Sequence, residues 1–233
     1  MDKPGLDVRQ WHFTLDDNPF LPPEYVANLK REYTGVFYER YIMGRWVAAE
    51  GRVYPMASDD PEYIVMRGPT HALRGAWYIS VDYGTANPCS MGLWCVTENG
   101  LAVRVSECYF DSRRAGRQKT DQEYYDDLRT LAGGRPIRRV VVDPSAASFI
   151  QLIRRNREFP VWGADNNVAD GIRVTAGMLA AGRVKIHESC RDALREFTLY
   201  RWENGDAPVK ENDHAMDDIR YFCKTILDRG HSI

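Results

Sequence analysis

Two apolar segments that each end in an aspartate restrict the fold of this chain more than any other feature. Segment 75–84, GAWYISVDYG, reaches Asp82 just before a glycine turn. Segment 138–146, RRVVVDPSA, runs through three valines to Asp143 and is broken by Pro144. Strands that are buried on both faces read as continuous apolar runs, and they lie in sheets that helices cover on both sides. The two segments therefore predict a mixed α/β domain.

From residue 52 onward, the chain alternates strand and helix patterns. Two further strands over 90–100 and 101–110 meet at Asn99-Gly100, a dipeptide that is a strong hairpin signal. Apolar residues at helical spacing predict the helices. These cover residues 120–134, 145–156, 168–182, 190–201 and 214–228, and short strands begin at residues 161 and 183. We therefore expect a three-stranded hairpin unit followed by strands that helices separate.

Residues 1–51 lack this alternation. A turn and a short helix are expected over 18–30, and the aromatic-rich stretch FYERYIMGRWVAAEG follows over 37–51. Such a segment is expected to pack on the next domain or on a region upstream of it. We therefore expect a connecting arm over 1–51 and an α/β domain over 52–233.

The composition narrows the class of protein further. Hydrophobic residues make up 44% and charged residues 27% of the chain, which is ordinary for a soluble globular protein. No apolar run approaches the roughly 20 residues that span a bilayer, so no membrane partner is expected. The five cysteines are scattered without a CxxC pair, which favours free thiols in a reducing, cytoplasmic setting. The net charge of −2 does not indicate a nucleic-acid binder by itself, although basic residues cluster over 113–119, 135–139 and 154–157.

A third acidic segment, ENDHAMDDIRY over 211–221, opens the last predicted helix. Asp82 and Asp143 each follow an apolar strand, where binding sites of open α/β sheets form, although each could also cap a turn. In the third segment, an aspartate in the first turn suits the helix dipole. Adjacent helical residues diverge by about 100°, so Asp217 and Asp218 should not ligate one metal equally. Periodicity alone does not choose between them.

Carboxylates from three segments, without a cysteine or multi-histidine set, are typical ligands of hard ions such as Mg²⁺ or Mn²⁺. Two such ions about 4 Å apart can activate a water and stabilise the leaving oxygen of a phosphodiester. A nuclease is therefore the natural chemistry for this pattern.

Three segments, VDYGTANPCS, VVVDPSAASF and ENDHAMDDIRY, resemble in this order the nuclease domain of phage terminase large subunits. The stretch 16–55 resembles the segment that links the ATPase and nuclease domains in that family. The resemblance implies an RNase H-like fold, a mixed central β-sheet flanked by helices on both faces. It also implies a two-metal endonuclease that cleaves concatemeric viral double-stranded DNA during genome packaging.

The resemblance further implies a set of metal ligands. Asp82 and Asp143 would be the first two ligands of two Mg²⁺ or Mn²⁺ ions. The last motif of the family, close to H-x-x-D-A-x-R-Y, places the third ligand at Asp217. The alanine of that motif is Asp218 in this chain, which makes Asp218 the alternative third ligand.

Other residues are expected to assist this centre. His214 would lie beside the metals as a weak ligand or a proton-handling neighbour, Lys210 would neutralise charge on the scissile phosphate, and Glu107 would be an extra acid. The basic clusters are expected to contact DNA phosphates. The expected DNA-binding residues are Arg113, Arg114, Arg117, Lys119, Arg138 and Arg139.

The resemblance also implies partners and a location. The partners would be double-stranded DNA, the portal protein, the small terminase subunit and the terminase ATPase domain, in the cytoplasm of the infected bacterial host. No G-x-x-x-x-G-K-[ST] loop occurs in the chain, so we expect an excised nuclease domain or one product of a split enzyme. Two alternatives stay open: a Holliday-junction resolvase or another RNase H-like nuclease, and a non-catalytic domain that docks on the portal or motor.

Overall fold

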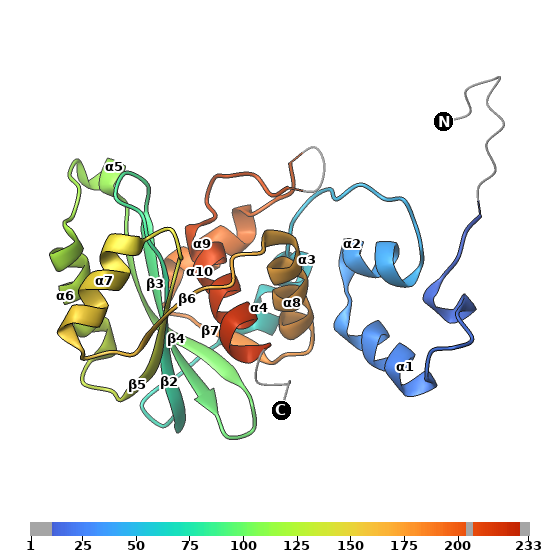
Figure 1. Ribbon diagram of the computed structural model, residues 1–233, viewed down its shortest axis with the longest axis horizontal. Coiled ribbons are helices and arrows are strands. Elements are labelled where there is room, and N and C mark those ends of the chain that lie inside the picture. Colours follow the sequence, from blue (N-terminus) through green and yellow to red (C-terminus); the bar gives the residue numbers. More distant parts are fainter. Residues whose placement is uncertain (1–10, 204–206, 229–233) are drawn as a thin grey trace. The chain divides into compact units, whose positions relative to one another are not determined.

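The computed structural model describes residues 11–203 and 207–228 and divides into two compact units, Met1–Ala48 and Ala49–Ile233 (Figure 1). In the smaller unit, a 3₁₀-helix η1 (Leu15–Asp17) precedes α1 (Pro23–Glu32). A short helix α2 (Gly35–Phe37) then continues into the π-helix η2 (Tyr38–Ile42). Proline at the first position of α1 suits a helix start, because its missing N–H would have no partner there.

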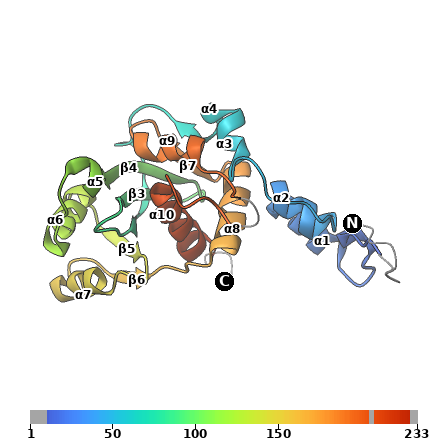
Figure 2. The same ribbon diagram turned by 90° about the horizontal axis from the view of Figure 1, so that it is seen from above.

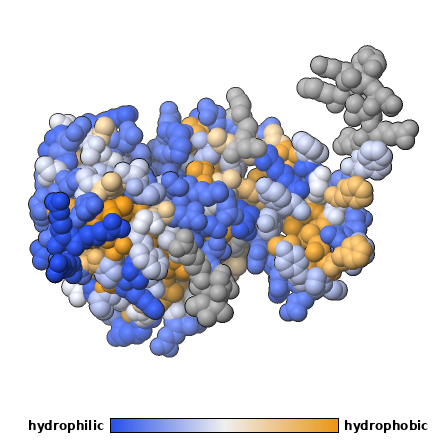
Figure 3. Space-filling model, in the orientation of Figure 1, coloured by the Kyte–Doolittle hydropathy of each residue, from blue (hydrophilic) through white to orange (hydrophobic). Residues whose placement is uncertain are grey.

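The smaller unit leaves many large apolar side chains at its surface, part of which is visible in Figure 3. Phe37 and Ile42 are buried within it, whereas Phe20 and Trp46 are 92% and 97% exposed. Other aromatic side chains that are more than half exposed in this unit are Trp11, Phe13 and Tyr41. The aromatic-rich stretch of the sequence thus contributes only part of its rings to a core.

The larger unit is built on a sheet of seven strands in the order β1-β7-β4-β3-β2-β5-β6. At its centre, β2 (Gly75–Asp82), β3 (Cys89–Thr97) and β4 (Ala102–Phe110) form an antiparallel meander. On one side, β5 (Ile137–Val142) and β6 (Val161–Gly163) continue parallel to β2. On the other side, β7 (Val184–His187) pairs parallel with β4, and β1 (Val65–Met66) pairs with β7. The expected mixed sheet is confirmed.

Helices cover both faces of this sheet (Figures 1 and 2). One face carries α6 (Asp121–Ala132) and α7 (Ala147–Asn156). The other carries α8 (Val168–Ala180), α9 (Arg191–Leu199) and α10 (His214–Phe222), which continues into the π-helix η3 (Cys223–Leu227). Three short helices complete the unit: α3 (Pro55–Asp59), α4 (Pro61–Ile64) and α5 (Ser112–Ala115).

The side chains of β2 show how the sheet separates a core from a site. Ile79 and Val81 belong to the apolar cluster beneath α6 and α7. Because side chains alternate along a strand, Ser80 and Asp82 point to the opposite face, where Ser80 hydrogen-bonds to α10. Within the part of the chain that the structure describes, no helix is both long and apolar enough to cross a membrane.

Candidate active site

A pocket of about 910 Å³ opens at the edge of the sheet where β2 and β5 end. In α/β sheets, ligands bind beyond the carboxyl ends of parallel strands, and β2 and β5 are such a pair. Asp82 ends β2, Asp143 directly follows β5, and Asp217 lies in the first turn of α10. All three line the pocket. The structure therefore brings together the three aspartates that the family resemblance implies as ligands.

Asp82 is a carboxylate in a poorly solvated position, with 9% of the residue exposed. Burial raises the pKa of Asp82 to about 7, a hydrogen bond from His214 opposes this rise, and the charge of Asp217 adds to it. The Nδ1 atom of His214 lies 2.9 Å from Oδ2 of Asp82. Burial lowers the pKa of His214, but the hydrogen bond and charge of Asp82, together with the charges of Asp213 and Glu196, shift it upward overall. The raised pKa values of Asp82 and His214 indicate that the centre has too little positive charge to balance its carboxylates.

Asp143 and Asp217 are held by different contacts. The Oδ1 atom of Asp143 accepts a hydrogen bond of 2.9 Å from the backbone N–H of Ser145, so the side chain does cap its turn. Asp217 forms an ion pair with Arg220, one turn later on α10, with Nη2 of Arg220 2.9 Å from Oδ1. The Nζ atom of Lys210 lies 3.7 Å from Oδ2 of the same carboxylate. Lys210 is mostly exposed and lines the pocket, next to the acids it was expected to assist.

Asp218, the alternative third ligand, lies elsewhere. Its side chain is fully buried and does not line the pocket. It accepts hydrogen bonds from the hydroxyls of Ser80 and Ser90 and forms an ion pair with Arg104. The rotation of about 100° between neighbouring helical residues sends Asp217 to the pocket and Asp218 to the sheet. The structure therefore gives no support to Asp218 as a ligand.

Glu107 was expected to be an extra acid of the centre, and the structure places it outside the pocket. Its carboxylate accepts hydrogen bonds from the backbone N–H groups of Asp192, at 2.7 Å, and Ala193, at 3.2 Å. These N–H groups open α9 and have no partner within that helix, so Glu107 satisfies them from β4. Glu107 thus caps the first turn of α9.

The six basic residues expected to bind DNA do not form one surface around the pocket. Arg113 lines the pocket and donates a hydrogen bond of 3.0 Å to Asn87. Arg138 and Arg139 lie near the start of β5, whereas Asp143 follows its end. The remaining three side chains lie outside the pocket: Arg114 is exposed on α5, Arg117 pairs with Glu123, and Lys119 pairs with Asp127. Of the six residues, Arg113 is the one placed to contact a substrate in the pocket.

Asp213 and Arg220 are among the pocket residues that were not predicted as functional. Asp213 directly precedes α10, but its side chain makes no cap hydrogen bond and instead lines the pocket. Its Oδ2 atom lies 3.7 Å from Nζ of Lys210. Arg220 is the arginine of the H-x-x-D-A-x-R-Y motif, three residues after Asp217. That spacing, which places two side chains on one helix face, was the available signal for its role.

The donor chemistry of the pocket fits a hard divalent cation, because its acidic ligands offer oxygen atoms alone. Asp82, Asp143 and Asp217 are the residues that would hold it. In the described part of the chain, no three acidic, histidine or cysteine side chains stand ready in a metal-binding arrangement. In this structure the carboxylates contact nitrogen-bearing side chains instead: His214 contacts Asp82, and Arg220 and Lys210 contact Asp217.

The sheet order defines the class of the domain. A meander of three antiparallel strands, continued by two strands parallel to the first, carries its acidic pocket at the strand ends. This is the RNase H-like α/β fold. No family model matches the chain, but curated and solved proteins do.

Phage terminases are among the matches. The large terminase of a thermophilic bacteriophage is 42% identical, with a TM-score of 0.84 over 93% of this chain and 54% of its own. The terminase large subunit of Escherichia phage T5 is 18% identical over 90% of this chain and 50% of its own length. The chain thus spans about half the length of these two relatives.

Solved nuclease domains share the fold. The P22 large terminase nuclease domain is 17% identical, with a TM-score of 0.62 over 75% of this chain and 92% of its own. The nuclease domain of the large terminase of bacteriophage SPP1, solved with bound Mn, is 16% identical, with a TM-score of 0.50 over 68% of this chain and 94% of its own. The resemblance to the nuclease domain of phage terminase large subunits is confirmed.

Proposed function

We propose that this chain is a metal-dependent endonuclease that cleaves concatemeric viral double-stranded DNA during genome packaging. The observation that carries the proposal is the meeting of Asp82, Asp143 and Asp217 at one pocket. The pocket lies at the strand ends of a fold that terminase nuclease domains share. Burying a carboxylate at a strand end without enough positive charge beside it costs free energy, and a bound cation would supply that charge.

Two Mg²⁺ or Mn²⁺ ions are the proposed cofactors, held by the three aspartates. When bound, such ions lower the pKa of a water and stabilise the departing oxygen of a phosphodiester. The Mn-bound SPP1 nuclease domain supports divalent metal use in this fold. Asp143 lies in a turn in which its carboxylate accepts a hydrogen bond from the backbone N–H of Ser145. This contact limits the movement of the Asp143 side chain.

The other pocket residues act on charge and position. His214 holds the carboxylate of Asp82 through Nδ1 and can take or give a proton there. Lys210 and Arg113 are cations at the pocket that can contact phosphates. Contacts of this kind are independent of base identity, so binding should be weakly sequence-selective and sensitive to salt.

The remaining parts of the proposal concern the larger assembly. The chain covers about half of the length of its relatives, so we propose that residues 1–51 connect the nuclease domain to an ATPase domain. The exposed aromatic side chains of the smaller unit leave apolar surface for such a contact. The portal protein and the small terminase subunit are the further proposed partners, in the cytoplasm of the infected host.

Plasmid cleavage tests the proposed function. The purified chain is incubated with supercoiled plasmid in Mn²⁺, Mg²⁺ or EDTA, beside a four-way junction and an RNA–DNA hybrid. We expect nicking and linearisation of the plasmid in metal and none in EDTA. Preferred cleavage of the junction or of the hybrid would indicate a different RNase H-like nuclease. The absence of cleavage and of any metal-dependent change in melting temperature would contradict an enzyme and favour a docking domain.

A further inference from the structure

A charged group is buried in the middle of the sheet, away from the pocket. Arg104 lies on β4 with its side chain fully buried. Both terminal nitrogens of its guanidinium contact the carboxylate of Asp218 on α10, with Nη2 3.0 Å from Oδ2. Nη2 also lies 3.4 Å from Oε2 of Glu107. Burying such a pair costs desolvation energy, and apolar residues of similar volume often serve stability equally well. The pair therefore needs another explanation.

The carboxylate of Asp218 is the centre of a complete set of hydrogen bonds. It accepts one from Ser80, at 2.7 Å, and one from Ser90, and Ser80 in turn accepts one from the indole N–H of Trp94, at 2.8 Å. Ser80 precedes Asp82 by two residues and shares its face of β2. Ser90 is the register partner of Asp82 on β3. The contacts of Asp218 therefore fix α10 to the sheet directly beside Asp82.

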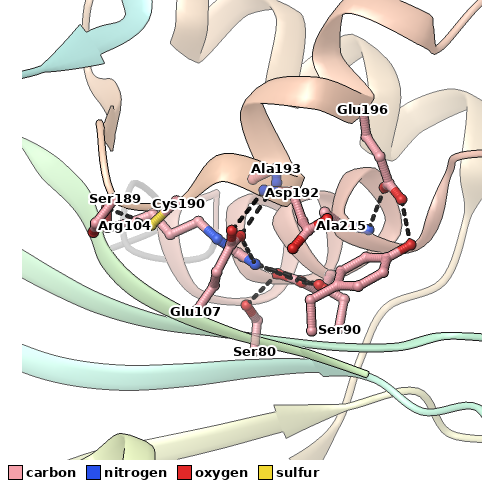
Figure 4. A network of polar contacts seen from close by, with 12 residues as sticks. Ser80, Ser90, Arg104, Glu107, Ser189, Cys190, Asp192, Ala193, Glu196 and Ala215 are labelled. Carbon is pink, nitrogen blue, oxygen red and sulfur yellow. Dashed lines mark hydrogen bonds and ion pairs between the residues drawn. The ribbon is translucent and has the colours of Figure 1, made fainter. Parts of the chain in front are cut away.

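A second set of contacts holds the start of α10 from α9 (Figure 4). The buried carboxylate of Glu196 accepts a hydrogen bond of 2.7 Å from the backbone N–H of Ala215 and one of 2.6 Å from the hydroxyl of Tyr109. α9 is held in turn by Glu107, which caps its first turn. Because Arg104 contacts both Glu107 and Asp218, the contacts close a ring through β4, α9 and α10.

The backbone around Arg104 leaves room for its guanidinium. Gly92, on the neighbouring strand β3, has no side chain, and a Cβ atom at this position would collide with the end of Arg104. The absence of a side chain at Gly92 thus leaves room for the buried guanidinium.

We propose that Arg104 is a positioning residue of the nuclease centre. By holding Asp218, it sets the rotation and depth of the first turns of α10, so that Asp217 and His214 on the same helix meet Asp82. The inference rests on the proposed function and deepens it, because it assigns to a residue outside the pocket the geometry of the metal ligands. Arg104 acts through Asp218 and does not touch substrate or metal.

A double variant separates positioning from stability. Arg104→Met alone leaves Asp218 as an unpaired buried charge, whereas Arg104→Met with Asp218→Asn removes both charges and keeps an amide for Ser80 and Ser90. We expect the double variant to recover most of the melting temperature that the single variant loses. Its affinity for Mn²⁺, measured by calorimetric titration, should still be weaker by about 10- to 100-fold, the usual effect of losing a group that orients a metal ligand. On plasmid, kcat should fall while KM stays unchanged.

Two further variants complete the test. Arg104→Lys keeps a buried positive charge for Asp218 but loses the two-nitrogen contact, so it should fold and still show weakened Mn²⁺ binding. Arg129→Met is the control, because Arg129 lies on α6, at the other face of the sheet, where it forms an exposed ion pair with Glu158. It should bind Mn²⁺ like the unchanged chain.

The outcomes distinguish the inference from the proposed function. If the unchanged chain neither binds Mn²⁺ nor cleaves plasmid, the proposed function fails and the inference fails with it. If the unchanged chain does both, and the double variant and Arg104→Lys do both equally well, the inference alone is overturned and the ring of contacts serves stability only.

Discussion

Asp82→Asn is expected to reduce metal-dependent plasmid cleavage by about 1,000-fold while making the metal-free chain more stable. The loss of activity follows because an amide is a poor ligand for a hard cation. Losing about 4 kcal/mol of charge stabilisation in the transition state corresponds to a rate lower by about 10³-fold. The gain in stability follows because burial of Asp82 makes its charged form unfavourable in the folded chain. Cleavage rates and melting temperatures in EDTA measure the two effects.

The sign of the pH dependence gives this prediction a second readout. The pKa of Asp82 is about 7 in the folded chain and 3.8 in its ordinary state. Between these pH values the folded state binds more protons than the unfolded state, so this group's contribution to stability falls as pH rises. The metal-free Asp82→Asn variant should lack that fall between pH 4 and about pH 7. An Asp126→Asn control, at an exposed position on α6, should leave cleavage unchanged. Full activity in Asp82→Asn would contradict the assignment.

Asp218→Ala is expected to lower the free energy of unfolding by about 3–5 kcal/mol, because it leaves the guanidinium of Arg104 buried without its main partner. That is a large share of the roughly 5–15 kcal/mol that stabilises a typical domain. Urea denaturation of the variant, beside Asp126→Ala, measures the difference. A variant with near-normal stability that had lost metal binding outright would show that Asp218 is a ligand after all.

Much of the fold could be predicted because its signals are local. The three valines before Asp143 mark a strand that is buried on both faces, and Asn99-Gly100 marks the hairpin between β3 and β4. Asp82 and Asp143 could be selected as a pair because each follows such a strand. The parallel register of β2 and β5, with Val81 opposite Val142, then brings the two side chains to one edge.

The rest of the site depends on contacts between distant segments. The burial of Asp218 depends on its contact with Arg104, which precedes it by 114 residues, and no local pattern contains that contact. The helix that begins near residue 191 was predicted, but its position beside Glu107 was not, so Glu107 was expected to be an active-site acid. The position of Arg138 and Arg139 could have been predicted. Because the strand runs toward Asp143, residues near its start lie at the end of the strand that is farthest from the pocket.

The most direct test of the metal centre is a crystal of the chain soaked in Mn²⁺ and measured at a wavelength where manganese scatters anomalously. We predict anomalous density in the pocket within bonding distance of Asp82, Asp143 and Asp217, and none beside Asp218. Density beside Asp218, or a pocket without density at a Mn²⁺ concentration that supports cleavage, would contradict the account.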